Sequence, residues 1–76
     1  MPKKKLPDLT PRQREVLDFI IEYWAEWSYS PANRDIGDYF DLQPNAVAGM
    51  LRRLETAGRI RTTPKIARSI VVLEEE

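Results

Sequence analysis

Hydrophobic residues recur at helical spacing from Pro11 to about Glu26, and this pattern predicts a first helix. Thr10 and Gln13 have the spacing of a capping box around Pro11, so the helix is expected to begin there. Its apolar face is expected to consist of Val16, Ile20, Tyr23, Trp24 and Trp27, widened by Leu17, Phe19 and Ile21. This arc is wide for so small a chain, which makes part of it a candidate for contact with another chain.

Two further helices are expected, separated by a tight connector. Pro31 breaks the first helix, and residues 33–40 are typical of a short second one. The second helix is expected to be buried through Ile36, Tyr39 and Phe40. Pro44 suits the first position of a third helix, with Gln43 as a weak cap, and Gly58 suits its left-handed C-terminal end.

The end of the chain is expected to form two short strands, at residues 59–63 and 69–73, joined by a basic tip. Three helices followed by a hairpin are typical of a winged helix-turn-helix, a mainly α fold with a small β-hairpin called the wing. We therefore expect a basic arm over residues 1–9, one domain over residues 10–73 and an acidic tail over residues 74–76.

The composition excludes several kinds of chemistry. The chain has 76 residues, which favours one small domain, and it contains neither cysteine nor histidine. Disulfides, thiolate chemistry, zinc sites built on Cys or His and histidine-based catalysis are therefore excluded. We expect no enzymatic activity, no cofactor and no metal. No membrane segment or secretory signal is apparent, so a cytoplasmic location is expected.

Charge is balanced overall but segregated along the chain. Twelve basic and twelve acidic residues give a formal net charge of zero. Residues 1–14 and 52–68 are strongly basic, whereas residues 15–51 and the last eight residues are acidic. Because electrostatic fields act over roughly 10 Å, local charge matters more than the sum. The chain is polarised if the fold gathers its basic segments.

The third helix is expected to turn Val47, Met50, Leu51 and Leu54 to the core. Its opposite face then carries Asn45, Gly49, Arg52 and Thr56, flanked by Ala48 and Arg53. Small residues let a helix approach base edges, Asn can pair with adenine, and arginines suit phosphate or guanine. Gly49 costs about 1 kcal/mol against alanine inside a helix. It is either a tolerated defect or a place where another molecule comes close.

Further basic residues follow in the hairpin, namely Arg59, Arg61, Lys65 and Arg68. Arg52 and Arg53 alone could be an ordinary solvated helix end, since basic residues there favour the helix dipole. Six basic residues against one acidic residue between positions 52 and 68 instead favour an anionic partner. The three lysines at positions 3–5 are read as a solubilising tail.

Residues 10–17 (TPRQREVL) resemble the opening of the DNA-binding domain of LexA-type repressors. Residues 44–46 resemble the start of that family's recognition helix, and residues 67–70 resemble the returning part of its wing. Leu51, Leu54, Gly58, Ile60 and Leu73 also fall in the family's positions. The similarity covers nearly the whole chain from Thr10, and it rests on the order and spacing of these motifs.

This resemblance implies a repressor domain that binds a palindromic operator. It assigns base reading to Gln43, Asn45, Ala46, Ala48 and Gly49, and contacts with the DNA backbone or minor groove to Lys65 and Arg68. Gln43, Ala48 and Gly49 differ from the family's residues, and the preceding turn is one residue shorter, so the operator cannot be carried over. The family's self-cleaving C-terminal domain is expected to be absent, and dimerisation would then need another surface.

Two functions follow as hypotheses. The first is a sequence-specific regulator that binds double-stranded DNA, a LexA-like repressor. The second is a winged-helix module that binds another regulatory protein through Trp24, Trp27 and Tyr29. A surface for such a partner, or for a second copy, is expected at Leu17, Ile21, Trp24 and Trp27.

Overall fold

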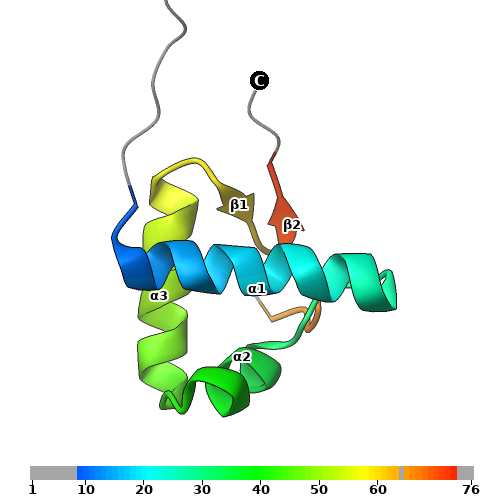
Figure 1. Cartoon of the computed structure of the whole chain (residues 1–76), viewed down its shortest axis with the longest axis horizontal. Coiled ribbons are helices and arrows are strands. Elements are labelled where there is room, and N and C mark those ends of the chain that lie inside the picture. Colours follow the sequence, from blue (N-terminus) through cyan, green and yellow to red (C-terminus); the bar gives the residue numbers. More distant parts are fainter. Residues whose placement is uncertain (1–8, 64, 74–76) are drawn as a thin grey trace, which may run out of the picture.

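Three helices precede a short antiparallel hairpin in the computed structural model, which describes residues 9–63 and 65–73 (Figure 1). The elements are α1 (Pro11–Trp27), α2 (Asn33–Phe40), α3 (Pro44–Thr56), β1 (Ile60–Arg61) and β2 (Val71–Val72). This confirms the expected order of elements. The basic arm and the acidic tail fall, apart from Leu9, outside the described residues.

The start of α1 is fixed by the capping box that the sequence predicts. The Gln13 backbone N–H donates to the Thr10 hydroxyl at 3.2 Å, and the Thr10 N–H donates to the Gln13 side-chain oxygen at 3.0 Å. These bonds satisfy N–H groups that a helix start otherwise leaves unpaired. The helix ends one residue later than expected, where Ser28 adopts a left-handed conformation with φ 63°.

The hydrophobic core is built from all three helices and the hairpin. Its buried side chains are Val16, Leu17, Ile20, Ile36, Val47, Leu51, Leu54, Ile60 and Ile70. Helix α3 crosses α1 near the N-terminal half of α1, whereas the C-terminal turn of α1 extends past α3 (Figure 1). The core therefore lies where these elements overlap.

Three aromatic side chains of the predicted apolar faces are exposed, namely Trp24, Trp27 and Tyr39, with Trp24 at 37%. Trp27 is 53% exposed because it lies in the last turn of α1, beyond the crossing with α3. Tyr39 is 68% exposed, and its ring stacks on Phe19 with centroids 4.6 Å apart. The helical pattern identified the apolar faces correctly. It could not show which part of each face the neighbouring elements cover.

A glycine makes the tight turn between α2 and α3 possible. The Leu42 N–H donates to the Gly37 carbonyl at 2.8 Å, and Asp41 takes a left-handed conformation with φ 58°. A Cβ atom at Gly37 would lie 2.9 Å from the Leu42 carbonyl oxygen, closer than such atoms normally approach. The turn that joins the two helices therefore requires glycine at this position.

The hairpin is shorter than the sequence indicated. Ile60 lies opposite Val72 and Arg61 opposite Val71, instead of two five-residue strands. Beyond Arg61 the segments separate, and they are joined by the Ser69 hydroxyl, which accepts from the Thr63 N–H at 3.0 Å and donates to the Thr63 carbonyl at 3.1 Å. Side-chain bonds replace the backbone ladder near the tip, so the strands end early. We call residues 59–73 the wing.

Replacing Gly37 with alanine is expected to lower the free energy of unfolding by about 1–3 kcal/mol, because the added methyl group overpacks the turn. The matched change Gly49→Ala is expected to raise it by about 1 kcal/mol, because alanine is the better helix former and its Cβ meets nothing within 4 Å. Urea unfolding monitored by circular dichroism measures both. A Gly37→Ala variant as stable as the parent would show that the turn is not tight.

Candidate nucleic-acid interface

The outer face of α3 carries the residues that the sequence placed there. Val47, Leu51 and Leu54 are buried, which turns the opposite face to solvent. The exposed or half-buried side of the helix holds Asn45, Ala46, Ala48, Gly49, Arg52 and Arg53, with Gln43 just before it. Met50, expected in the core, is half-buried against it. The orientation of α3 predicted from the sequence is thus confirmed.

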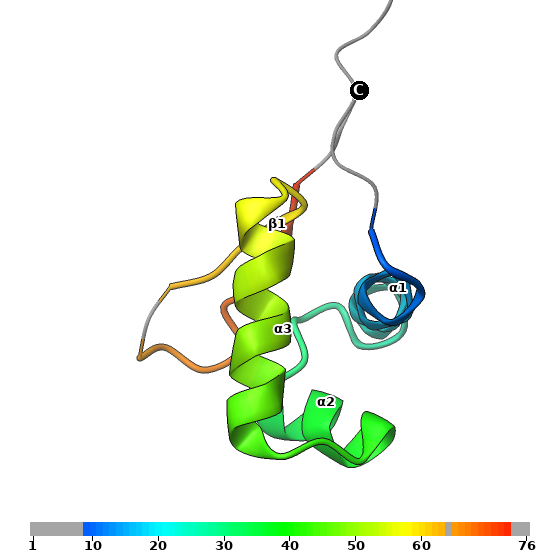
Figure 2. The same cartoon turned by 90° about the vertical axis from the view of Figure 1, so that its left-hand side faces the viewer.

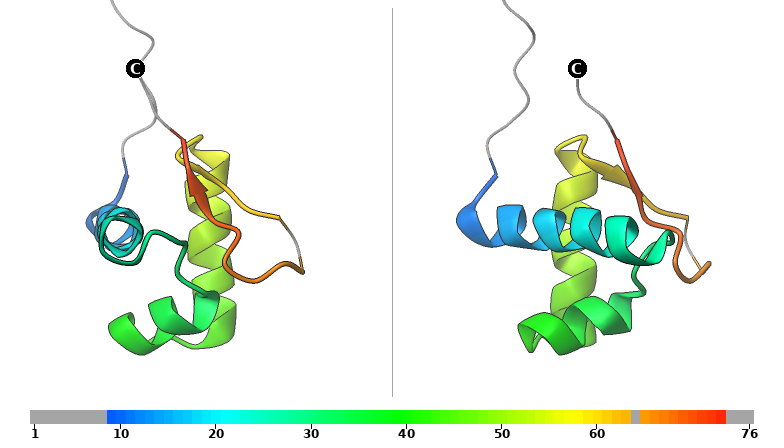
Figure 3. Two further views of the ribbon diagram at one scale, coloured as in Figure 1. Left: turned by 90° about the vertical axis from the view of Figure 1, so that its right-hand side faces the viewer. Right: turned by 45° about the vertical axis from the view of Figure 1, so that its right-hand side comes forward.

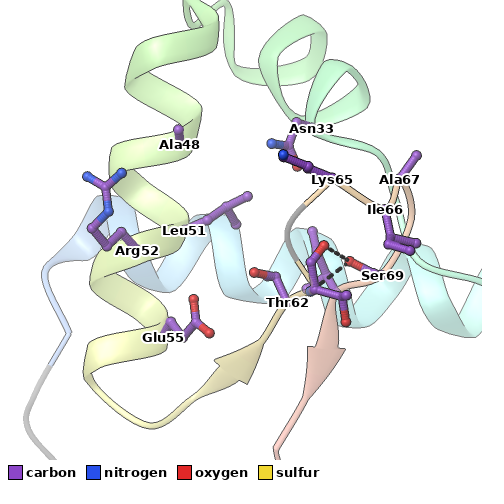
Figure 4. A pocket seen from close by; sticks show the side chains of 12 residues that line it. Asn33, Ala48, Leu51, Arg52, Glu55, Thr62, Lys65, Ile66, Ala67 and Ser69 are labelled. Atoms are coloured by element: carbon purple, nitrogen blue, oxygen red, sulfur yellow. Dashed lines mark hydrogen bonds between the residues drawn. The ribbon is translucent and has the colours of Figure 1, made fainter.

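A groove separates α3 from the wing, and we call it the wing groove. It has a volume of about 590 Å³. Figure 2 shows the wing loop on the side of α3 opposite α1. Ala48, Leu51, Arg52 and Glu55 of α3 line one wall, and Thr62, Lys65, Ile66 and Ala67 of the wing line the other (Figure 4). Arg52 and Lys65 therefore border the same groove, as the sequence predicted.

The wing groove is not uniformly basic. Figure 4 shows the Glu55 carboxylate on the groove side of α3, whereas the Arg52 guanidinium extends along the outside of the helix. Lys65 lies on the far wall close to Asn33 of α2. Positive charge stands at the rim of this groove, and a negative charge lies within it.

A second groove flanks the other side of α3, between this helix and the start of α1. We call it the helix groove. It has a volume of about 300 Å³ and is lined by Thr10, Gln13, Ala46, Gly49, Met50 and Arg53. Nothing in the sequence pattern indicated this groove, because it arises from the angle at which α1 meets α3. The outer face of α3 is therefore a ridge with a groove on each side.

The remaining basic residues of the wing differ in accessibility. Arg61 and Lys65 are exposed, whereas Arg59 is half-buried at the turn after α3. Arg59 is bonded to the end of the wing through its backbone, because its carbonyl accepts from the Leu73 N–H at 2.9 Å. Arg61 and Lys65 are thus exposed cations of the wing, and Arg68 is also exposed but pairs within the chain.

Arg68 instead directs its guanidinium toward the helices. One terminal nitrogen, Nη1, lies 3.2 Å from Asp35 Oδ2 and donates to the Tyr23 hydroxyl at 3.1 Å and to the Ser30 carbonyl at 3.0 Å. The same guanidinium lies over the Tyr29 ring, 5.0 Å from its centroid. The returning segment of the wing lies near the connection between α1 and α2 (Figure 3), where Ser30 bonds both Arg68 and Ile70. Sequence reasoning missed these contacts because they join residues 33 to 45 positions apart.

Asp35 is the acidic centre of this cluster. Its Oδ2 atom accepts from the Ala32 backbone N–H at 2.9 Å and from the Tyr23 hydroxyl at 3.2 Å, and it pairs with Arg68. These donors stabilise the charged carboxylate, the Ala32 N–H most strongly, and together they lower the pKa of Asp35. The Tyr23 contact in turn raises the pKa of Arg68, so both partners stay charged.

The aromatic surface of α1 is only partly as expected. Ile21, Trp24 and Trp27 are exposed, but Leu17 is buried at 4% exposure and belongs to the core, so its proposed place at a partner surface is wrong. Trp24 donates its indole N–H to the Ile70 carbonyl at 3.1 Å. Trp24, Tyr23 and Tyr29 thus contact the wing from the side of α1.

Residues 9–63 and 65–73 show no group of three acidic side chains arranged to hold a metal ion. Over the same part of the chain, none of the helices combines the length and apolar character needed to cross a membrane.

The fold and the site together define a winged helix-turn-helix domain, in which α3 occupies the position of a recognition helix beside the wing. The family model of the LexA DNA binding domain matches residues 6–69. The chain belongs to this family.

Individual relatives agree with this assignment. The LexA repressor of Thermosipho africanus is 41% identical over 69 residues, which cover 91% of this chain and 35% of that protein. The LexA repressor of Bacillus pumilus is 44% identical over 69 residues, covering 90% of this chain and 34% of that protein. The chain therefore spans about a third of the length of these relatives.

The contacts of Asp35 are expected to make the free energy of unfolding fall at acidic pH. Because folding lowers the pKa of Asp35, the carboxylate contributes stability above its unfolded value of about 3.9, and this contribution is lost as the pH falls through the folded-state pKa. Urea unfolding of the parent chain and of Asp35→Asn between pH 6 and pH 2.5 measures it. The difference between the two is expected to be constant above about pH 5 and to shrink below pH 4. A constant difference throughout would contradict the assignment.

Proposed function

We propose that this chain is a sequence-specific double-stranded DNA-binding domain of a transcriptional repressor, with α3 as its recognition helix. The observation that carries the proposal is the ridge of α3, which presents small side chains at its start and lies between two grooves bordered by arginine and lysine. Its membership of the LexA DNA-binding family supports the same conclusion. Repression would follow from occupying promoter DNA.

The ridge has the form that a DNA major groove accepts. The major groove is about 12 Å wide, admits one α-helix and is bordered by two phosphate backbones. With α3 in the major groove, one backbone would lie along the wing groove and the other along the helix groove. Arg52 and Lys65 would then meet phosphates on one side, and Arg53 on the other. The Glu55 carboxylate would repel a phosphate deep in the wing groove, so the backbone would lie at the rim of this groove.

Base recognition is proposed for the first two turns of α3. Asn45 is exposed and can pair with an adenine edge, and Ala46 and Ala48 can contact thymine methyl groups. Gln43 stands just before the helix and can reach a neighbouring base. A Cβ atom at Gly49 would meet nothing within 4 Å, so no contact in this chain requires glycine there. Close approach of DNA explains why a poor helix former occupies this position.

The named relatives are repressors, and we propose that this chain also acts on operators with two symmetric half-sites, bound by two copies. Such a protein works in the compartment that holds the DNA, which in bacteria is the cytoplasm. The protein-binding alternative through Trp24, Trp27 and Tyr29 is not favoured, although these side chains are exposed, because the chain belongs to the LexA DNA-binding family and its named relatives are repressors.

Arg52→Ala is expected to weaken binding to all DNA sequences and to reduce the salt dependence of affinity by about 0.9 in the log–log slope, the value for one phosphate contact. Fluorescence anisotropy with a labelled duplex at several salt concentrations measures this slope. Arg12→Ala is the matched control, because Arg12 pairs with Glu15 at 3.4 Å and lies over the Phe40 ring. An unchanged slope for Arg52→Ala would remove Arg52 from the interface.

Asn45→Ala is expected to relax the preference at one base pair, with a loss of discrimination of about 1–3 kcal/mol there. Selection of bound sites from a random DNA pool, followed by titration of single-base variants, measures this loss. Glu22→Ala changes an exposed residue of α1 away from both grooves and is expected to leave the preference unchanged. If Asn45→Ala selects the same sites as the parent, the proposed base-reading face is incorrect.

A further inference from the structure

The wing is attached to the helices at both of its sides, through Ile60 of β1 in the core and through the hydrogen bonds of its returning segment. The Ile70 N–H donates to the buried Ser30 hydroxyl at 3.2 Å, and the Ile70 carbonyl accepts from the Trp24 indole at 3.1 Å. Two residues earlier, Arg68 reaches the Ser30 carbonyl at 3.0 Å. The tip with Lys65 and Ile66 is exposed and projects from this attachment.

Arg68 joins three segments at this attachment. Its Nη1 atom contacts Asp35 of α2, Tyr23 of α1 and Ser30 of the connection between them. Tyr23 also donates to Asp35 at 3.2 Å, so the three polar side chains are mutually bonded. We call Arg68, Asp35 and Tyr23 the clasp.

The backbone at Arg68, like that at Lys65, lies in an unfavourable conformation. Arg68 has φ 56°, in the left-handed region that non-glycine residues seldom occupy. Such a conformation costs free energy and persists only where surrounding contacts hold it. The clasp supplies these contacts at the residue where the wing turns back toward β2.

We propose that Arg68 serves DNA binding as a positioning residue, which acts through Asp35 and Tyr23 to hold the wing at a fixed angle to α3. This inference rests on the proposed function. A wing that is already fixed loses less conformational freedom when DNA binds, and this raises affinity without any contact from Arg68 to the nucleic acid. Lys65, three residues earlier and exposed, is then the wing residue that meets phosphate.

The alternative is that Arg68 itself contacts a phosphate, as the family resemblance implies. The two roles give opposite outcomes when Asp35 is neutralised. A phosphate-binding arginine would be released from its carboxylate partner, and the loss of a negative charge would strengthen binding to a polyanion. A positioning arginine would lose its anchor, the wing would become more mobile, and binding would weaken.

The test measures the affinity of Asp35→Asn for a duplex by fluorescence anisotropy at low salt. We expect Asp35→Asn to bind roughly three- to tenfold more weakly than the parent, a typical effect of losing a charged hydrogen-bonded pair. Asp38→Asn is the matched control, because Asp38 is an exposed acid on the same helix. It removes the same charge and is expected to bind as tightly as the parent or slightly tighter. Tighter binding by Asp35→Asn would overturn the proposal.

Tyr23→Phe provides a second test. It changes no charge and removes only one hydroxyl group, so it disturbs the fold less than Asp35→Asn does. It removes the hydroxyl that bonds both Arg68 and Asp35, and we expect it to weaken DNA binding in the same direction as Asp35→Asn. Amide hydrogen exchange at residues 65–67 is expected to be faster in both variants, with α3 unaffected. Unchanged affinity and unchanged exchange in Tyr23→Phe would contradict the clasp.

Binding by the parent chain separates this inference from the proposed function. If the parent fails to bind duplex DNA at low salt and micromolar concentration, the proposed function is wrong, and with it a role of the clasp in DNA binding. If the parent binds and Asp35→Asn binds equally well or better, only the positioning role of Arg68 is wrong.

Discussion

The rotation of α3 about its own axis decides what this molecule can present to a partner. Val47, Leu51 and Leu54 are almost completely buried, and full burial of each such side chain is worth about 1.5–3 kcal/mol. Turning the helix by one residue would expose part of this stripe and bring Arg52 toward the core, where an unpaired charge is costly. The outward position of Asn45, Gly49 and Arg52 on the helix follows from this burial. The two flanking grooves depend on it as well, since both are walled by α3.

Local features of the fold were predictable from the sequence. The capping box at Thr10, the proline at the start of α3 and the left-handed Gly58, with φ 79°, are short-range signals, and each lies where the pattern placed it. The outward face of α3 also followed from its period. Features that depend on how elements meet were not predictable in this way. Trp27 is exposed because it lies beyond the crossing of α1 with α3, and Tyr39 is exposed although its ring stacks on Phe19. The strands shorten because Ser69 bonds Thr63 with its side chain.

The functional site shows the same division. The order of elements in the sequence was enough to predict that Arg52 and Lys65 border one groove. The contacts of Arg68 could not be predicted from its charge. A basic residue in a basic hairpin suggests contact with an anion. Here the nearest anion is Asp35 of the same chain, which pairs with it across 33 positions of sequence. Similarly, the need for glycine at Gly37 becomes visible only when the Leu42 carbonyl is seen beside it.

At Gly49, the stability of α3 and the proposed recognition of DNA favour different residues. A methyl group would fit there without strain in the isolated chain, and it would make the helix more persistent. Laboratory evolution for heat resistance alone would therefore favour replacing Gly49 by alanine. If α3 reads base pairs as proposed, the enriched variants would be more stable and yet less able to approach a base pair closely, so glycine would persist only where DNA binding is also selected.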